Sequence, residues 1–143
     1  MREEMMDLLS IIGLVDYAEL PASELSIGQR RLLALGRAMA MRPKLLLLDE
    51  PAAGLSPYNV DNMMRIVMEL RDRYGLTVVI IEHILRVVME VCERVTVLDY
   101  GQKISEGTPD QVKEDPVVVE AYLGQEIKDT ELHSDLKSKA EVV

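Results

Sequence analysis

The stretch Leu45-Leu46-Leu47-Leu48-Asp49-Glu50 places two adjacent carboxylates directly after four apolar residues. A short, uniformly apolar run predicts a β-strand that is buried on both faces, as in parallel sheets. Two acids at the carboxyl end of such a strand are typical of nucleotide hydrolysis, in which Asp49 would hold Mg²⁺ and Glu50 would orient or deprotonate the attacking water. The alternative is a core strand that ends at the surface in two solvated acids, and this stretch alone does not separate the two interpretations.

A second motif precedes this strand and a third follows it. The stretch Leu25-Ser26-Ile27-Gly28-Gln29 lies upstream, and a second apolar strand downstream, Thr77–Ile81, leads into Glu82-His83. In their order and spacing, the three motifs resemble the signature, Walker B and switch-histidine motifs of ATP-binding-cassette (ABC) ATPases. Together they are more specific than any one of them. Ile27 departs from the family's Leu-Ser-Gly-Gly-Gln pattern, in which that position is often glycine.

Three stretches most resemble the ATP-binding subunits of branched-chain amino-acid importers. They are Asp49-Glu50-Pro51-Ala52-Ala53-Gly54-Leu55, Gly107-Thr108-Pro109 and Ala121-Tyr122-Leu123-Gly124. The resemblance runs from near the N-terminus to Gly124 and implies the α/β class: a partial P-loop NTPase (ABC ATPase) domain, mostly parallel sheet with flanking helices and a C-terminal hairpin. It divides the chain into residues 1–24, a remnant of the helical subdomain, and residues 25–124, the C-terminal part of the ATPase domain. Residues 125–143 are expected to form a disordered tail.

Ser26 is expected to cap a helix over residues 27–41. Its side chain can accept a hydrogen bond from a first-turn amide, and Gly28 in that turn lets a ligand approach the backbone closely. A helix N-terminus with exposed amides binds anions, although an ordinary capped helix is the alternative. In the resembled family this helix end binds the γ-phosphate of ATP held by the other subunit. The resemblance therefore implies that role for Ser26, Gly28 and Gln29.

His83 lies just past the carboxyl end of a strand, where open α/β sheets bind their ligands. A surface histidine at a strand–helix junction is the alternative interpretation. The resemblance implies that His83 senses the γ-phosphate bound in its own subunit. Two further positions depart from the family: Ile84 follows His83 where Asp is common, and Ser56 stands where the family's D-loop, here residues 51–56, usually has Asp. The second departure weakens the inference that paired sites communicate.

The phosphate-cradling loop G-x-x-x-x-G-K-[ST] does not occur in these 143 residues. Its backbone amides and lysine make most of the phosphate contacts in such enzymes, so the remaining motifs do not supply the residues that bind the triphosphate. The chain therefore resembles the C-terminal part of the ATPase domain, from a truncated, split or decayed gene. We expect no independent ATP turnover by this polypeptide.

Composition excludes several other classes of protein. The 16 Lys and Arg against 25 Asp and Glu give a net charge of −9, the wrong sign for a nucleic-acid surface or an anionic membrane. A single cysteine, Cys92, permits no disulfide framework and fits a reducing compartment. No apolar run approaches the length of a membrane span, and no signal peptide is visible. We expect a cytoplasmic protein, peripheral to the inner face of the cell membrane when assembled, with no nucleic-acid partner and no direct membrane insertion.

Local patterns also predict the remaining elements. Helices are expected over residues 1–12 and 57–74, the second capped by Ser56 and ended by Gly75. The helix after His83 is expected to bury Leu85, Val88, Met89 and Cys92. Residues 95–106 read as a hairpin, and Thr108-Pro109-Asp110-Gln111 as a capping box that opens a further helix. His133 has no partner at metal-ligand spacing and is expected to be solvated.

The favoured function is the C-terminal part of an ABC transporter ATPase subunit that couples ATP binding and hydrolysis to import of branched-chain amino acids or related solutes. The resemblance implies ATP and Mg²⁺ as cofactors, with a second ABC ATPase subunit and membrane permease subunits as partners. Two alternatives stay open. One is a non-catalytic or decayed subunit that only donates its signature motif to a complete partner. The other is the ATPase of a non-transport ABC system, such as one in DNA repair.

Overall fold

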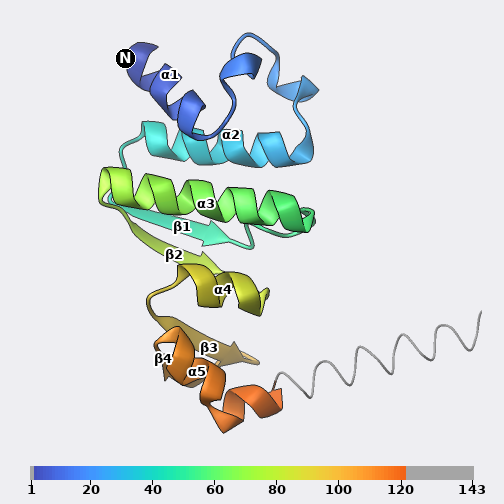
Figure 1. The fold of residues 1–143 in the computed structure, drawn as a ribbon, viewed down its shortest axis with the longest axis vertical. Helices are drawn as coiled ribbons and strands as arrows, with labels where there is room; N and C mark the ends of the chain where they lie inside the picture. The colour runs from blue at the N-terminus through green and yellow to red at the C-terminus, as the bar shows by residue number, and fades with distance from the viewer. Residues whose placement is uncertain (1, 122–143) are drawn as a thin grey trace, which may run out of the picture. The chain divides into compact units, whose positions relative to one another are not determined.

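The computed structural model describes residues 2–121, and this part of the chain divides into two compact units after Val91 (Figure 1). The expected tail over residues 125–143, the solvated His133 and most of the closing stretch after Ala121 lie outside the described residues.

The first unit alternates helices with two strands. Its elements are α1 (Arg2–Ile11), two 3₁₀ turns (Val15–Tyr17 and Ala22–Glu24), α2 (Ile27–Ala40), β1 (Leu45–Asp49), α3 (Pro57–Tyr74), β2 (Thr77–Ile81) and α4 (Leu85–Val91). The predicted ends of the helices are confirmed. Ser26 caps α2, Ser56 caps α3, and Gly75 ends α3 in the left-handed conformation at φ 62°.

Strands β1 and β2 form a parallel pair. Leu45 pairs with Thr77, and the register continues to Asp49 opposite Ile81. One further hydrogen bond, from the Glu50 amide to the Ile81 carbonyl at 2.9 Å, extends the pairing past the end of β1. Because both strands run in the same direction, the residues that follow them meet at one edge of the pair.

Helices α2 and α3 run along the same side of the β1–β2 pair (Figure 1). Alternate strand residues point to this side: Leu46 is buried, and Leu48, Val78 and Ile80 are partly buried against the core. The helices contribute the other half of the core, with Leu35 and Met39 from α2 and Val60, Met63, Met64, Ile66, Val67 and Leu70 from α3. The methionines predicted on this face of α3 are therefore core residues.

The prediction that the apolar strands are buried on both faces is wrong for this structure. Leu45 and Leu47 in β1 are 51% and 67% exposed, and Val79 and Ile81 in β2 are 48% and 61% exposed. Side chains alternate between the two faces of a strand, and within the described part of the first unit the helices pack on one face of this pair. The sequence pattern indicates that both faces of each strand are apolar, whereas burial depends on what packs against each face.

The predicted buried face of the helix after His83 is also wrong. In α4 the fully buried side chain is Val87, at 1% exposure, with Ile84 and Val91 packed against the same core. The predicted residues, among them Leu85 and Val88, are only partly buried. Both sets have helical spacing and both are apolar, so the pattern alone did not show which one turns inward.

A glycine allows α1 and α2 to approach each other closely. A Cβ atom built on Gly36 would lie 2.7 Å from Cδ1 of Ile12, which is itself 1% exposed. Real Cβ contacts are longer than this, so a side chain at position 36 would force the side chain of Ile12 to shift. The contact fixes α1 on the unit that carries the sequence motifs.

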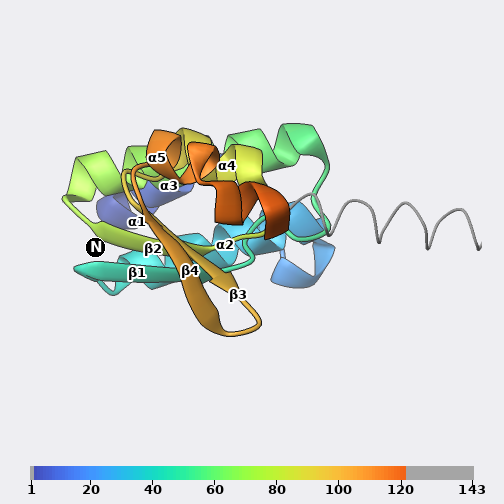
Figure 2. The same ribbon diagram turned by 90° about the horizontal axis from the view of Figure 1, so that it is seen from below.

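The second unit contains the predicted hairpin and capped helix. Strand β3 (Val95–Asp99) pairs antiparallel with β4 (Gln102–Gly107), and Figure 2 shows the two strands joined by a turn. Tyr100 and Gly101 form the turn, both with positive φ, as in a type I′ hairpin turn. Helix α5 (Pro109–Glu114) begins at Thr108 with the predicted capping box, and residues 116–121 are helical.

Candidate functional site

The carboxyl edge of the β1–β2 pair brings Glu50 and His83 together. Nδ1 of His83 lies 3.8 Å from Oε1 of Glu50, and the two side chains are 67% and 54% exposed. Asp49, the last residue of β1, is exposed at the same edge. The structure thus places two carboxylates, Asp49 and Glu50, and the imidazole of His83 at one solvent-accessible edge.

Glu50 has an unusual backbone conformation. Its φ is 43°, in the left-handed region that residues other than glycine rarely adopt. For a residue with a Cβ this conformation costs about 1–2 kcal/mol. Strained residues of this kind persist only where the surroundings fix them, and they concentrate at functional sites.

Two side chains hold the peptide group that follows Glu50-Pro51. Nη1 of Arg31, on α2, donates to the Pro51 carbonyl at 2.8 Å, and the Ala52 amide donates to Oε1 of Glu82 at 2.8 Å. Ala52 is 1% exposed, and the Glu82 side chain is fully buried. The sequence analysis missed Glu82, which appeared there only as the residue before His83. An acid directly after an apolar strand was the available signal.

At the start of α2, the predicted phosphate-binding residues Ser26 and Gln29 bind each other. The backbone N–H of Gln29 donates to Oγ of Ser26 at 3.3 Å, and the backbone N–H of Ser26 donates to Oε1 of Gln29 at 2.9 Å. This reciprocal capping box fixes the first turn of the helix. Each side chain would have to break its capping hydrogen bond before it could bind a phosphate.

Gly28 has space around it within its own chain. A Cβ built there would meet Cδ2 of Leu55 at 3.8 Å and Nδ2 of Asn59 at 4.0 Å, which are ordinary contacts. Packing within this unit therefore does not require glycine at position 28. A bare backbone in the first turn of a helix does suit the close approach of an anion to the amides. The same contacts place the start of α2 beside the start of α3.

The predicted site residues thus form two groups in the first unit. Asp49, Glu50 and His83 lie at the edge of the strand pair, and Ser26, Gly28 and Gln29 lie in the capped first turn of α2. Arg31 joins the groups, since it belongs to α2 and binds the carbonyl of Pro51 next to Glu50.

Asp49 is the candidate metal ligand at this edge. Among residues 2–121, no group of three or more His, Cys, Asp and Glu side chains is arranged to hold a metal ion. Mg²⁺ in nucleotide sites is held by one or two carboxylates, with phosphate oxygens and water supplying the other ligands. Asp49 fits that pattern, and the remaining ligands would come from a nucleotide and solvent.

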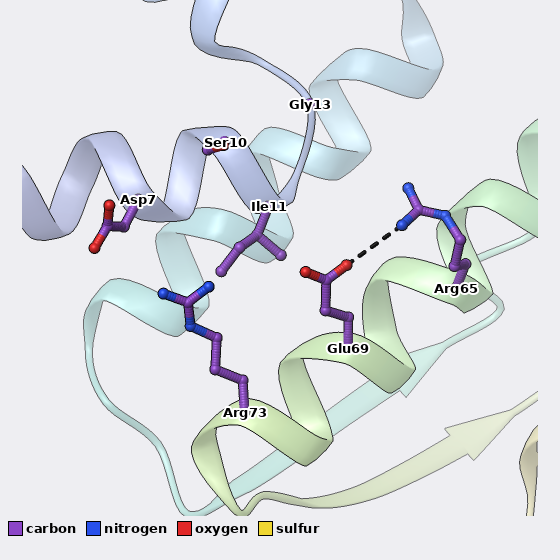
Figure 3. Close-up of a pocket in the computed structure, with 7 residues that line it drawn as sticks. All are labelled: Asp7, Ser10, Ile11, Gly13, Arg65, Glu69 and Arg73. Carbon is purple, nitrogen blue, oxygen red and sulfur yellow. Dashed lines mark hydrogen bonds and ion pairs between the residues drawn. The ribbon is translucent and has the colours of Figure 1, made fainter.

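A pocket of about 330 Å³ lies elsewhere, between α1 and α3 (Figure 3). It is lined by Asp7, Ser10, Ile11, Gly13, Arg65, Glu69 and Arg73. Both signs of charge are present, and Nη1 of Arg65 lies 3.3 Å from Oε2 of Glu69 across one helical turn. None of the predicted site residues lines this pocket, so it carries no part of the proposed chemistry.

Comparison with known proteins decides the family. A model described as "ABC transporter" matches residues 1–53, and one described as "Branched-chain amino acid ATP-binding cassette transporter" matches residues 102–128. The chain is 38% identical over 117 residues to the high-affinity branched-chain amino acid transport ATP-binding protein BraF of Pseudomonas aeruginosa, covering 82% of this chain. The chain belongs to the ABC-transporter ATP-binding family.

The fold of this ABC ATPase chain agrees with solved cassettes. The ADP conformation of MJ1267, an ATP-binding cassette of an ABC transporter, superposes with a TM-score of 0.76 at 36% identity, over 85% of this chain and 49% of that one. The chain also covers only 46% of BraF, so it spans about half the length of these relatives. The predicted α/β class and partial ABC ATPase fold are confirmed.

Identity levels do not separate the possible transport systems. The lipopolysaccharide export system ATP-binding protein LptB of Haemophilus influenzae is 39% identical over 127 residues, covering 89% of this chain and 52% of LptB. That value is close to the 38% found for BraF. Over residues 2–121, no helix of the ABC ATPase chain is long and apolar enough to cross a membrane.

Proposed function

We propose that this ABC ATPase chain supplies the hydrolytic edge and the signature helix of a cassette that couples ATP binding and hydrolysis to import of branched-chain amino acids or related solutes. The single observation that carries the proposal is the 3.8 Å separation of His83 Nδ1 and Glu50 Oε1 at the carboxyl edge of a parallel strand pair. Ligands of open α/β sheets bind at this edge. The match to residues 102–128 supports the importer class.

In this proposal each residue at the edge has a separate task. Glu50 accepts a proton from the attacking water or orients it, His83 donates a hydrogen bond to the γ-phosphate, and Asp49 holds Mg²⁺. The metal ion would neutralise charge that develops on the phosphate oxygens. The exposure of Glu50 and His83 leaves both side chains accessible to a nucleotide and to water.

The signature residues act on a different nucleotide. Ser26 caps α2, and Gly28 and Gln29 lie in its first turn, where backbone amides and the helix dipole favour a phosphate. In the proposed assembly this turn faces ATP held by a second ABC ATPase subunit, and membrane permease subunits complete the transporter. The open surroundings of Gly28 support such an approach.

A second candidate function rests on the start of α2. Ser26 and Gln29 form the capped first turn within this unit, so the chain can present a signature motif to a nucleotide held by another subunit. In that case the chain is a non-catalytic subunit that completes the ATP site of a partner.

A chimeric cassette tests the two functions against each other. A segment of BraF that carries the P-loop, which the resembled family places ahead of the signature motif, is joined in front of residue 1. The 143-residue chain alone is expected to bind ATP weakly without turnover, whereas the chimera is expected to release phosphate steadily in the presence of Mg²⁺. A folded, ATP-binding chimera without turnover would favour the non-catalytic function, and steady turnover by the isolated chain would contradict the proposal.

A further inference from the structure

The peptide group between Pro51 and Ala52 is held at both ends by side chains from distant parts of the chain. Its carbonyl accepts from Nη1 of Arg31 at 2.8 Å, and its amide donates to Oε1 of Glu82 at 2.8 Å. Both bonds involve a charged group, which makes them stronger than bonds between neutral groups. One contact comes from α2 and the other from the end of β2, so this peptide is fixed between two packed elements.

The carboxylate of Glu82 is buried, which is unusual for an acidic side chain. Its side chain is fully buried, and Oε2 has no hydrogen-bond partner among the described residues. Oε2 lies 3.8 Å from Nδ1 of His83, beyond hydrogen-bond distance. A buried carboxylate with one unsatisfied oxygen costs solvation free energy that a smaller apolar residue would avoid. Such a group persists where its remaining contact has a use.

The use that the geometry indicates is control of Glu50. Its amide is fixed by the Ile81 carbonyl at 2.9 Å, and its own carbonyl accepts from the Ala53 amide at 3.1 Å. The held peptide begins one residue later, and between these contacts Glu50 keeps its strained φ of 43°. Releasing the peptide would allow Glu50 to relax toward the extended conformation that a residue before proline prefers.

We infer that Glu82 and Arg31 are positioning residues that hold the Pro51–Ala52 peptide and thereby aim the carboxylate of Glu50 at the attacking water. The inference rests on the proposed function for its catalytic part, since it assigns Glu50 the role of base. Its structural part, the fixed peptide, stands independently of catalysis. Arg31 extends the arrangement to the signature helix, because any displacement of α2 acts on the peptide next to Glu50.

The structural part is tested by hydrogen exchange of the Ala52 amide in the chimeric cassette. Glu82→Ala removes the acceptor and is expected to speed exchange at Ala52 by about 10-fold or more, while amides of β1 keep their protection. Glu82→Gln retains an acceptor oxygen and is expected to restore slow exchange. Glu24→Ala, at an exposed acid in a 3₁₀ turn, is the matched control. Unchanged exchange at Ala52 in Glu82→Ala, or an equal change throughout β1, would overturn the inference.

The catalytic part is tested by steady-state and single-turnover kinetics. Glu82→Ala and Arg31→Met are expected to lower kcat about 10-fold to 100-fold with KM for ATP unchanged, because they misplace the base without touching the nucleotide. Arg37→Met, on the exposed side of the same helix, should leave kcat unchanged. In a Glu50→Gln background neither substitution should lower the residual rate further. A rise in KM alone, or an equal loss in both backgrounds, would overturn the positioning role.

The two readouts separate failure of this inference from failure of the proposed function. A folded chimera that never hydrolyses ATP would contradict the proposed function, and exchange at Ala52 would still decide whether the peptide is held. Turnover that depends on Glu50, with no effect of Glu82→Ala on either readout, would leave the proposed function intact and overturn the inference.

Discussion

Nδ1 of His83 lies 3.8 Å from Oε1 of Glu50, although the two residues belong to different strand ends. The parallel register explains this, since Asp49 pairs with Ile81 and the next residues of both segments leave the pair at the same edge. A register shift of one residue would turn every strand side chain to the other face and would separate the two groups. The spacing of the strand residues therefore sets the geometry of the proposed catalytic edge.

The first prediction concerns Glu50 as the base. In the chimeric cassette Glu50→Gln is expected to lower ATP turnover by about 10²–10⁴-fold, because the amide keeps the shape of the side chain and cannot accept the proton. The affinity for ATP should stay nearly unchanged. Phosphate release and nucleotide-binding calorimetry measure the two quantities.

Glu24→Gln serves as the control, since Glu24 is an exposed acid away from the strand edge. Equal turnover in wild type and Glu50→Gln would show that another group accepts the proton.

The second prediction contrasts two glycines of α2. Gly36→Ala brings a Cβ within 2.7 Å of Ile12 Cδ1 and is expected to destabilise the first unit by about 1–3 kcal/mol, offset in part by alanine's higher helix propensity of about 1 kcal/mol. Gly28→Ala meets its neighbours no closer than 3.8 Å and should leave stability nearly unchanged. Its Cβ should instead hinder a phosphate at the helix start, so turnover of the chimera should fall.

Denaturant unfolding and ATP turnover, measured on both variants, separate packing from binding. Normal turnover in Gly28→Ala would contradict the proposed signature role, and unchanged stability in Gly36→Ala would show that Ile12 can move aside.

The accuracy of the sequence-based predictions depended on how far apart the interacting residues are. The caps at Ser26, Ser56 and Thr108 were predicted correctly because each involves a residue three positions away. Glu82 was missed because its partner, the Ala52 amide, is thirty positions away. A local pattern contains no information about which backbone amide a buried carboxylate will meet.

The predictions of which side chains are buried were wrong for a related reason. Four consecutive leucines predicted a strand covered on both faces, yet Leu45 and Leu47 are exposed while Leu46 is buried. In α4 two apolar stripes competed, and packing against the core selected the one that contains Val87. Apolar composition shows which surfaces can be buried, and only the arrangement of other elements shows which ones are.

The third prediction concerns pH and the second unit. Ser105 donates a hydrogen bond from Oγ to Asp115 at 2.6 Å, and with the Val117 amide it holds the pKa of Asp115 below the ordinary value of 3.8. A pKa lowered by folding stabilises the folded state at pH above that ordinary value. The contribution is lost as pH falls through the lower, folded-state pKa.

Ser105→Ala should therefore lower the stability of the second unit at pH 6, and the difference from wild type should shrink as the pH falls below about 4. Thermal unfolding between pH 2 and pH 7 measures this, with Ser23→Ala in the first unit as a control. A difference that stays constant down to pH 2 would show that the hydroxyl contributes packing alone.

The last prediction concerns the exposed face of the β1–β2 pair. Leu45, Leu47, Val79 and Ile81 together present an apolar surface, all four being between 48% and 67% exposed. Exposed apolar patches and open strand edges associate with other chains. The 143-residue chain by itself is therefore expected to self-associate, with an apparent mass that rises with protein concentration in light scattering.

Leu47→Lys should reduce this association, because it places a charge in the middle of the patch without entering the core on the opposite face. Met41→Lys is the matched control, since Met41 is 82% exposed at the end of α2 and lies outside the patch. In the chimeric cassette the added segment is expected to cover the face, so the effect of Leu47→Lys should change from improved solubility to lost stability. A wild-type chain that stays monomeric at all concentrations, with the same behaviour in Leu47→Lys, would mean that these four side chains do not drive association.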